Sequence, residues 1–380
     1  MAKVIQPLVL HAFSTFGVGG PQVRFANLVA AFGQRYRHIV AAMDGNYSCR
    51  SIIKSSAPVT YLDLRYPSGS TLRKALYFRT RLREIRPDLL VTYNWGAIEW
   101  AIANAAAVVR HVHVEDGFGP DETDRRLRRR SWARRLWLRS CSVVVPSRIL
   151  HRIATQEWGL PTDHVQYIPN GVKCARSDQR FDSKLRELWP GNGLIIGTVA
   201  TLRPEKNITR LIRAFRLVLD TYACRMVIVG DGPERYRLEL LSSALGLGDR
   251  IHFTGHMENP RRAYRGFDIF ALSSDTEQMP FTILEAMAAG LPIASTGVGD
   301  IDEMVSAPNR AFVSASDEIE LAQALKTLLG DARARTRLGQ GNRSKALNCF
   351  NHDAMVEAYD RLFSGNCPAT AASQWRGVPQ

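Results

Sequence analysis

Two acidic residues flank the start of a predicted helix, and their types suit the binding of hydroxyl groups beside an anion. Glu277 precedes Pro280, and Glu285 lies in the helical segment that follows. Proline is favoured at the first helical position, so we expect the helix to begin there. The backbone N–H groups of Phe281 and Thr282 would then lack intrahelical acceptors and carry the positive end of the helix dipole. Such a helix start favours an anion.

The acidic pair also has a simpler interpretation. In this interpretation Glu277 only stabilises the positive end of the helix dipole, and Glu285 is an ordinary exposed helix residue. However, Glu285 stands among the apolar Ile283, Leu284 and Met287. A carboxylate in such surroundings needs a hydrogen-bonding partner, and a ribose diol fits because one carboxylate accepts from both hydroxyls.

Cations are found in a second segment, GTVATLRPEKN at 197–207, which reads as a strand followed by a loop. Arg203 and Lys206 at the carboxyl end of a strand suit a pyrophosphate whose negative charge grows as it departs. The alternative is a solvated loop of a basic protein. VGDGPE at 229–234 either lines the same site or only reverses the chain.

A glycine-rich turn follows the first predicted strand. Gly17, Gly19 and Gly20 allow a tight turn and a close approach of backbone to ligand at the start of a helix. The spacing is not that of the dinucleotide-binding fingerprint. A tight turn with no ligand is the alternative.

HVHVEDGFGPDE at 111–122 ends another predicted strand with titratable groups. His111 and His113 share one face of the strand, so they form either a metal-binding pair or a buried pair with satisfied nitrogens. Asp116 stands where the strand gives way to a loop and is better placed to reach a substrate.

Bulk composition indicates a globular protein of two domains. The chain has 380 residues, of which 45% are hydrophobic and 23% charged, and this length exceeds what one core supports. Neither a membrane-spanning apolar run nor a signal-peptide pattern is found, so we expect a cytoplasmic protein. Six scattered cysteines without a C-x-x-C pair indicate neither zinc nor a disulfide framework.

The net charge of +14 implies anionic partners, and much of the excess is local. Eight arginines lie between Arg125 and Arg139, interleaved with Trp132, Leu136, Trp137 and Leu138. This pattern predicts a basic amphipathic helix suited to an anionic membrane surface, which would make the protein peripheral on the inner face of the membrane. The alternatives are a solvated surface helix and a nucleic-acid site. We do not expect nucleic acid, because no recognised nucleic-acid module accompanies the run.

Strands alternate with helices in both halves of the chain, which predicts parallel sheets covered on both faces and hence two doubly wound α/β domains facing a cleft. Strands are predicted at 7–13, 38–43, 59–62, 88–93, 111–114 and 142–146, and then at 194–200, 225–230, 250–255, 268–274, 292–296 and 311–314. Beyond 311 we expect helix to about 363. The predicted parts are a first domain at 1–170, a linker at 171–192, a second domain at 193–350, a helix at 351–364 that returns to the first domain, and a flexible tail at 365–380.

Together these segments resemble the retaining glycosyltransferases of the GT-B fold, in the large fourth sequence family that includes bacterial cell-envelope sugar transferases. GTVATLRPEKN, VGDGPER, IHFTG and EQMPFTILEAMAAGLPIAST occur in the order and spacing typical of the family. The resemblance implies two Rossmann-like domains, a nucleotide-sugar donor held mainly by the second domain, and an acceptor held mainly by the first.

The resemblance also implies roles for individual residues. Glu285 would bind the donor ribose and Glu277 the sugar hydroxyls near the reacting carbon. Lys206 would neutralise the leaving diphosphate, which the loop at Gly19 and Gly20 would close upon. Backbone N–H groups around three further residues would meet the sugar or the diphosphate: Met279, Phe281 and Thr282. No metal or other cofactor is expected, because these cations and helix N-termini take its place.

The chain departs from the family pattern at two positions. Thr201 stands where the family usually has arginine, and Arg203 would substitute from a shifted position. Asp116 stands where the family commonly has a histidine near the anomeric carbon. An aspartate there either accepts the acceptor proton, stabilises positive charge on the sugar, or marks altered or lost activity.

The hypothesis from the sequence is transfer of a hexose from a nucleoside-diphosphate sugar to a hydroxyl acceptor with retention at the anomeric carbon. A lipid-linked or cell-surface polysaccharide precursor is the expected acceptor, from the family resemblance and the arginine run. Two alternatives remain: a sugar-nucleotide epimerase of similar architecture, and a non-catalytic, membrane-associated protein that binds nucleotide sugars.

Overall fold

In the computed structural model the chain forms two compact units. The structure describes residues 6–54, 56–118, 127–173 and 193–366. Unit 1 combines the chain up to Asn170 with the segment that begins at Asp353, and unit 2 runs from Gly171 to His352. Most of the expected linker at 171–192 and of the expected tail at 365–380 lies outside the described residues, as do Arg125 and Arg126.

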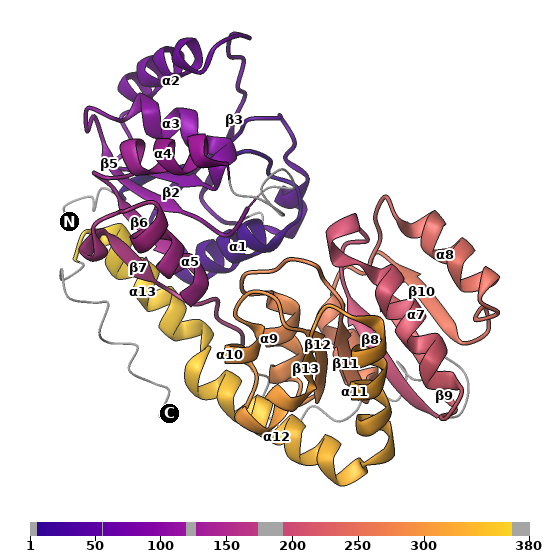
Figure 1. The fold of residues 1–380 in the computed structure, drawn as a ribbon. Helices are drawn as coiled ribbons and strands as arrows, with labels where there is room; N and C mark the ends of the chain where they lie inside the picture. The colour runs from indigo at the N-terminus through magenta and orange to yellow at the C-terminus, as the bar shows by residue number, and fades with distance from the viewer. Residues whose placement is uncertain (1–5, 55, 119–126, 174–192, 367–380) are drawn as a thin grey trace. The chain divides into compact units, whose positions relative to one another are not determined.

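Unit 1 is built on a seven-stranded parallel sheet with the order β3-β2-β1-β4-β5-β6-β7 (Figure 1). Its strands are β1 Leu8–Phe13, β2 Arg37–Ala42, β3 Val59–Leu62, β4 Leu89–Tyr93, β5 Arg110–Val114, β6 Ser142–Val145 and β7 Val165–Tyr167. Its helices are α1 Gly20–Phe32, α2 Thr71–Ile85, α3 Ile98–Ala103, α4 Arg128–Trp137, α5 Arg148–Arg152 and α13 His352–Ser364. The central strands are apolar because helices cover both faces of a parallel sheet, and every residue of β4 is buried.

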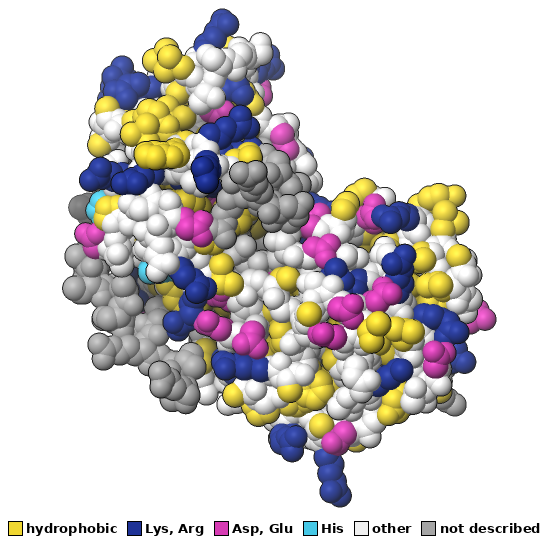
Figure 2. Space-filling model, in the orientation of Figure 1, with side chains coloured by type: hydrophobic (Ala, Val, Ile, Leu, Met, Phe, Trp, Pro, Cys, Tyr) yellow, Lys and Arg dark blue, Asp and Glu magenta, His cyan; other side chains and the backbone are white. Residues whose placement is uncertain are grey.

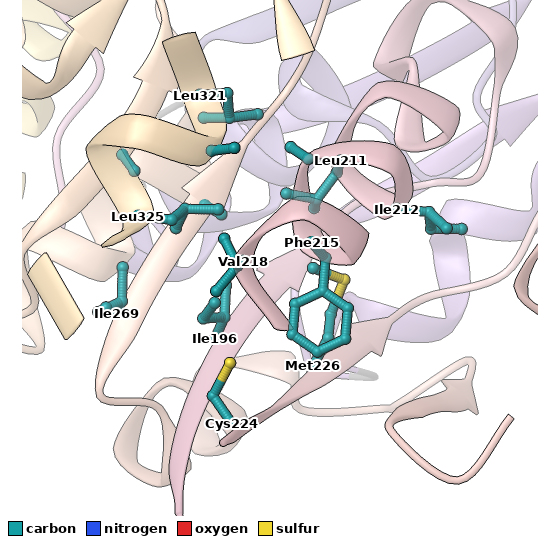
Figure 3. Packing of buried hydrophobic residues seen from close by; sticks show 14 of the residues in the cluster. Ile196, Leu211, Ile212, Phe215, Val218, Cys224, Met226, Ile269, Leu321 and Leu325 are labelled. Atoms are coloured by element: carbon teal, nitrogen blue, oxygen red, sulfur yellow. The ribbon is translucent and has the colours of Figure 1, made fainter. Parts of the chain in front are cut away.

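Unit 2 has a six-stranded parallel sheet with the order β10-β9-β8-β11-β12-β13. Its strands are β8 Leu194–Val199, β9 Cys224–Val229, β10 Ile251–Gly255, β11 Ile269–Leu272, β12 Ile293–Thr296 and β13 Val313–Ser314. Its helices are α7 Ile208–Leu219, α8 Arg235–Ala244, α9 Phe281–Ala288, α10 Ile301–Met304, α11 Glu318–Gly330 and α12 Ala332–Cys349. Figure 3 shows how α7 and α11 bury Phe215, Val218 and Leu325 against the sheet residues Ile196 and Met226.

These two sheets confirm the predicted α/β class with two doubly wound domains, and the twelve predicted strands are all present. The structure adds β7, whose three residues Val165–Tyr167 are too few to show a pattern. Beyond β13 the chain is helical to Ser364, close to the predicted end at 363, and it forms three helices. The division between α11 and α12 was not predicted: Asp331 ends α11 and caps α12 by accepting from the Ala334 N–H at 2.8 Å.

The last helix belongs to the core of unit 1, although unit 2 separates it from the rest of that unit in the sequence. Met355, Tyr359, Leu362 and Phe363 of α13 are buried with residues of β1, α1 and β4. Before α13 begins, the Val172 N–H donates to the Phe350 carbonyl at 2.8 Å. No helix in the described part of the chain is long and apolar enough to span a membrane.

Candidate functional site

The strand order of each sheet reverses once, and this determines where a ligand can bind. In unit 1 the reversal lies between β1 and β4, and in unit 2 between β8 and β11. Open α/β sheets bind ligands outside the carboxyl ends of the strands at such a switch point. The loops after β8 and β11 contain Lys206 and Glu277, and the loop after β1 ends at Gly19, directly before Gly20 begins α1.

Lys206 and Glu277 meet at the switch point of unit 2. Lys206 ends the 3-10 turn Pro204–Lys206, and its Nζ donates to Glu277 Oε1 at 2.6 Å. The Ser274 hydroxyl donates to the same oxygen at 2.8 Å. The side chains of Lys206 and Glu277 are 26% and 11% exposed, so the pair is partly open to a ligand. The two loops thus place a cation and a carboxylate side by side.

The helix start beside this pair differs slightly from the prediction. Pro280 is the N-cap residue rather than the first helical residue, and α9 begins at Phe281 with no side-chain cap. The first-turn N–H groups therefore have no capping side chain as acceptor, which is the arrangement that favours an anion. The Met279 side chain is buried in the core of unit 2, so only its backbone can serve a ligand.

Glu285 has protein partners that the sequence did not show. Arg261 Nε donates to one carboxylate oxygen at 2.9 Å, and the Tyr264 hydroxyl donates to the other at 3.0 Å. Both partners lie in the turn Pro260–Gly266 before β11. Burial, reinforced by the charge of Glu285, raises the pKa of Tyr264 well above its ordinary value, so the phenol stays a donor.

Arg203 is not part of this cluster. Its side chain is 54% exposed, and its guanidinium is 4.0 Å from Glu205. Arg210, in contrast, contacts the loop that carries Glu277. Its Nη1 donates to the Ser273 carbonyl at 2.8 Å, and its Nη2 is 2.7 Å from Asp275. Sequence reasoning missed Arg210, whose position inside α7 resembles that of the other surface arginines.

The glycines of 229–234 and Gly299 allow backbone segments to pack closely in unit 2. A Cβ atom on Gly232 would lie 2.5 Å from the Leu202 carbonyl oxygen, and the Leu202 N–H donates to the Asp231 carbonyl at 2.9 Å. This segment therefore supports the loop that carries Lys206. A Cβ atom on Gly299, whose φ is +59°, would lie 2.4 Å from the carbonyl oxygen of Glu277.

At the switch point of unit 1, Gly19 is the N-cap residue of α1 in an extended conformation, and Gly20 is the first helical residue. A Cβ atom on Gly19 would come within 2.8 Å of Gln22 Oε1, and the Gln22 amide donates to the Thr15 carbonyl at 2.9 Å. The tight turn is therefore present, and closure on a diphosphate stays a prediction.

Asp116 is held by a buried arginine. Arg24 of α1 donates to both Asp116 oxygens, at 2.5 and 2.6 Å, and to Asn170 Oδ1 at 3.0 Å. The Arg24 and Asp116 side chains are 1% and 10% exposed. The Asp116 N–H donates to Asn94 Oδ1 at 2.6 Å. Burial opposes the charge on Arg24, but Asp116 outweighs it and raises the pKa of Arg24. A proton-accepting role for Asp116 would compete with this ion pair.

His111 and His113 share one hydrogen-bonding partner, the Thr92 hydroxyl. Each approaches the Thr92 hydroxyl to 2.8 Å, and His113 Nε2 lies 3.5 Å from Glu115 Oε2. Burial and the neighbouring His113 lower the pKa of His111 to about 3, so it stays neutral near pH 7. Among the described residues no group of three His, Cys, Asp or Glu side chains is arranged to hold a metal.

The arginine run forms a helix, but part of it is core. α4 covers Arg128–Trp137, and Arg134 is buried with its Nε 3.0 Å from Glu115 Oε2. Its guanidinium lies 4.8 Å from the centre of the Trp158 ring, and Leu138 is also buried. The interpretation of the run as a surface helix is therefore wrong for Arg134 and Leu138. Both side chains are buried, and Arg134 pairs with Glu115 and packs against aromatic rings.

The chain matches two family models, glycosyl transferases group 1 over residues 179–345 and glycosyltransferase family 4 over residues 18–176. It is also 33% identical, over 91% of its length and 95% of the relative, to the lipopolysaccharide core biosynthesis glycosyltransferase LpsD of Rhizobium meliloti. The chain belongs to the group 1 glycosyltransferases of family 4. A second relative from the same organism, the lipopolysaccharide core biosynthesis glycosyltransferase LpsE, is 24% identical over 91% of this chain and 96% of the relative.

Solved structures show the same GT-B fold as this glycosyltransferase. HepE of Anabaena, crystallised with UDP-glucose, matches with a TM-score of 0.79 over 94% of this chain and 99% of that chain, at 20% identity. The sucrose-phosphate synthase of Thermosynechococcus elongatus matches with a TM-score of 0.74 over 95% and 99%, at 19% identity.

In this glycosyltransferase the sequence indicated the acidic and basic members of the cluster in unit 2 but not their protein partners. Arg24, Asn94, Tyr264 and Arg261 were missed. For Arg24 the sequence did contain one local indication of a place near the site, because this residue lies on the helix that follows the glycine turn. Its partner Asp116 is 92 positions away, and only the fold brings the two together.

Proposed function

We propose that this glycosyltransferase moves a hexose from a nucleoside-diphosphate sugar to a hydroxyl of a lipopolysaccharide or other cell-surface polysaccharide precursor, with retention at the anomeric carbon. The observation that carries the proposal is the contact between Lys206 and Glu277 at the switch point of unit 2, beside the uncapped start of α9. The names of LpsD and LpsE support the acceptor class.

In the proposed reaction Lys206 and the first-turn N–H groups of α9 bind the diphosphate. The bond between the anomeric carbon and the diphosphate oxygen breaks, and negative charge grows on that oxygen. A fixed ammonium group and helix N–H groups stabilise this charge without reorganisation, as in other preorganised sites. We infer that Lys206 turns from Glu277 to the diphosphate when the donor arrives.

Glu277 then has a free oxygen for the sugar hydroxyls, while Ser274 still orients its carboxylate. Glu285 binds the ribose diol. In the structure its oxygens accept from Arg261 and Tyr264, and the half-exposed Arg261 is the partner that a diol would replace. Tyr264 is buried and would keep the carboxylate in place.

Unit 1 binds the acceptor in this proposal, with Asp116 near the reacting hydroxyl. The carboxylate either accepts the acceptor proton or stabilises positive charge on the sugar. Since Arg24 occupies both oxygens of Asp116, charge stabilisation fits the ion pair better than proton transfer does. No metal is required, because Lys206 and α9 supply the positive charge.

A donor panel tests the proposal. The purified protein is incubated with glucose donors of uridine, guanosine and adenosine diphosphate, with and without lipid-linked core saccharide, and released nucleoside diphosphate is measured. UDP-glucose comes first, because HepE has been crystallised with it.

We expect release that rises in the presence of the acceptor, with a product whose new linkage keeps the donor's anomeric configuration. Conversion of the donor sugar without an acceptor would show an epimerase instead. Donor binding without turnover under every condition would show a non-catalytic protein, and an inverted linkage would contradict retention.

A further inference from the structure

Two helices of unit 1 expose large apolar side chains at helical spacing. On α4, Trp132 is 68% and Leu136 is 66% exposed, and on α2, Leu72 is 67% and Leu76 is 59% exposed. The members of each pair are four positions apart, so each pair forms a short stripe on one side of its helix. We call the surface that carries these four side chains the α2–α4 face.

The helices that carry the two stripes belong to one layer of unit 1. α3 packs against both α2 and α4. Figure 1 shows the three helices stacked beside the same sheet, and Figure 2, in the same orientation, shows hydrophobic side chains over this region between Lys and Arg side chains. Clustered apolar surface rimmed by charge marks an interaction site more often than scattered apolar residues do.

The charge on α4 has one sign, whereas α2 carries the exposed Glu84, which pairs with Arg81 on the same helix. α4 contains no acidic residue. Arg128, Arg129 and Arg135 are exposed on it, and Arg139 is exposed just beyond its end. On α2, Arg73 is exposed next to Leu72. A helix with exposed tryptophan and leucine on a basic face, without acids, suits the headgroup region of an anionic bilayer.

α8 of unit 2 shows why the charge matters. Its Tyr236 and Leu240 are also four positions apart and are 74% and 53% exposed. Its arginines, however, are neutralised within one or two turns. Arg235 lies 3.2 Å from Asp231 and 2.8 Å from Glu239, and Arg237 lies 2.8 Å from Glu234. Apolar exposure alone is therefore common to both units, and of the helices α2, α4 and α8 it is α4 that combines it with arginines and no acidic residue.

We propose that the α2–α4 face docks on the surface of an anionic lipid bilayer. Trp132, Leu136, Leu72 and Leu76 enter the interface between headgroups and acyl chains, and Arg128, Arg129 and Arg135 bind the headgroup phosphates. Arg134 takes no part, because it is bound to Glu115. The inference does not depend on the proposed function, since any activity of the chain is compatible with it.

Sedimentation with vesicles tests the proposal. The full chain is centrifuged with vesicles of phosphatidylglycerol and phosphatidylcholine at 3:7, and with vesicles of phosphatidylcholine alone. We expect binding only to the first, weakened by salt. Arg128→Glu/Arg129→Glu/Arg135→Glu should weaken binding by at least about a hundredfold, since each basic residue near such a surface contributes roughly fivefold.

The apolar part has a matched control. Trp132→Ser/Leu136→Ser and Leu72→Ser/Leu76→Ser should each weaken binding, whereas Tyr236→Ser/Leu240→Ser, an equally exposed pair at the same spacing, should not. All six side chains are exposed, so the variants should fold, and nucleoside-diphosphate release with a soluble acceptor should match the wild type.

Three results would overturn the proposal. One is wild-type protein that does not sediment with the anionic vesicles. Another is equal loss of binding in the α8 control. The third is light scattering that shows self-association removed by Trp132→Ser/Leu136→Ser while vesicle binding persists, because the face would then bind a second copy of the chain.

Discussion

Three cations that pair with carboxylates in this glycosyltransferase differ in how far they are buried. Arg24 and Arg134 are each 1% exposed and bound to a carboxylate, whereas Lys206 remains 26% exposed beside Glu277. Removing one member of a buried pair leaves an uncompensated buried charge, so the buried arginines primarily affect stability. Lys206 can change partners at little cost, which is what a ligand-binding cation needs.

Lys206→Met should lower donor turnover by about 10²- to 10³-fold, the usual effect of removing one group that stabilises transition-state charge. The exposed Arg203 provides the control, because Arg203→Met removes a cation from the same loop that does not contact Glu277. Nucleoside-diphosphate release is the measurement for both. Turnover within twofold of wild type in Lys206→Met, with donor binding unchanged, would remove Lys206 from the site.

At the residue scale the sequence predicted those groups whose position follows from one strand and its loop. Lys206 and Glu277 each lie in the loop that follows a strand, and parallel strands place their carboxyl ends at one edge. The contacts of Glu285 with Tyr264 and of Asp116 with Arg24 could not be predicted, because each joins different elements at a register that packing determines. The burial of Arg134 could not be predicted for the same reason, because Arg134 lies on α4 and its partner Glu115 lies in the loop after β5.

Among the elements, the position of the loop between β11 and α9 depends on a close contact with the backbone of the loop after β12. Gly299 provides this approach: the carbonyl oxygens of Glu277 and Gln278 lie 2.4 and 2.7 Å from where its Cβ atom would be. Its φ of +59° also lies in the region that favours glycine. The loop that carries Glu277 is thus positioned by a neighbouring backbone as well as by side chains.

Gly299→Ala should therefore displace the backbone at Glu277 and lower donor turnover at least tenfold, besides losing stability. Gly246→Ala is the matched control, since Gly246 has a similar φ of +68° but nothing within 4 Å of the added carbon. It should cost only about 1 kcal/mol of folding free energy from backbone strain and leave turnover unchanged. Equal turnover in the two variants would mean that the close contact does not position Glu277.

The positions of the strands were the most predictable feature of this structure, because fully buried parallel strands appear in the sequence as short apolar runs between turn residues. β7 and the division between α11 and α12 were missed for physical reasons. Three residues cannot show a period, and a helix boundary set by one aspartate cap, Asp331, interrupts the pattern for only a residue or two.

For the whole molecule, buried histidines should make unit 1 sensitive to acid. Burial lowers the pKa of His38 to about 4 and, together with His113, that of His111 to about 3, from an ordinary value of 6.5. Below pH 6.5 the unfolded chain takes up protons that the native imidazoles do not, so stability is full above pH 6.5 and falls as pH decreases toward 4 and 3. Each histidine contributes roughly 1.4 kcal/mol per pH unit across its window.

His111→Gln should flatten this dependence, because the amide stays neutral and can still bond to Thr92. The melting temperature at pH 7.5, 6.5, 5.5 and 4.5 is the measurement, compared with His256→Gln, which alters an exposed histidine. We expect a smaller decrease between pH 6.5 and 4.5 in His111→Gln alone. Parallel curves for all three proteins would show that other groups govern the acid sensitivity.

The core of unit 1 also depends on a helix that the chain reaches only after unit 2. Phe363 of α13 is 3% exposed, and its ring centre lies 5.7 Å from that of Phe32 and 6.0 Å from that of His11. Phe363→Ala should destabilise unit 1 by about 3–5 kcal/mol, as expected for truncating a buried phenylalanine.

Hydrogen exchange read by mass spectrometry locates this loss. Peptides from β1 and β2 should exchange faster in Phe363→Ala, while peptides from β8 and β9 keep the wild-type rate. Leu347→Ala, which truncates a 44% exposed side chain on α12, should leave both regions unchanged. Faster exchange in β8 and β9 would mean that the two units do not unfold separately.

The place of α13 in unit 1 also bears on the order of events during synthesis. Domains generally fold as the ribosome releases them, from the N-terminal end onward. Unit 2 is one continuous segment and can fold as soon as His352 has left the ribosome. Unit 1 begins first but lacks Met355, Tyr359 and Phe363 until the last helix emerges. The half of the enzyme that is made first is therefore the half that is finished last, and its open core is what a chaperone would meet on the nascent chain.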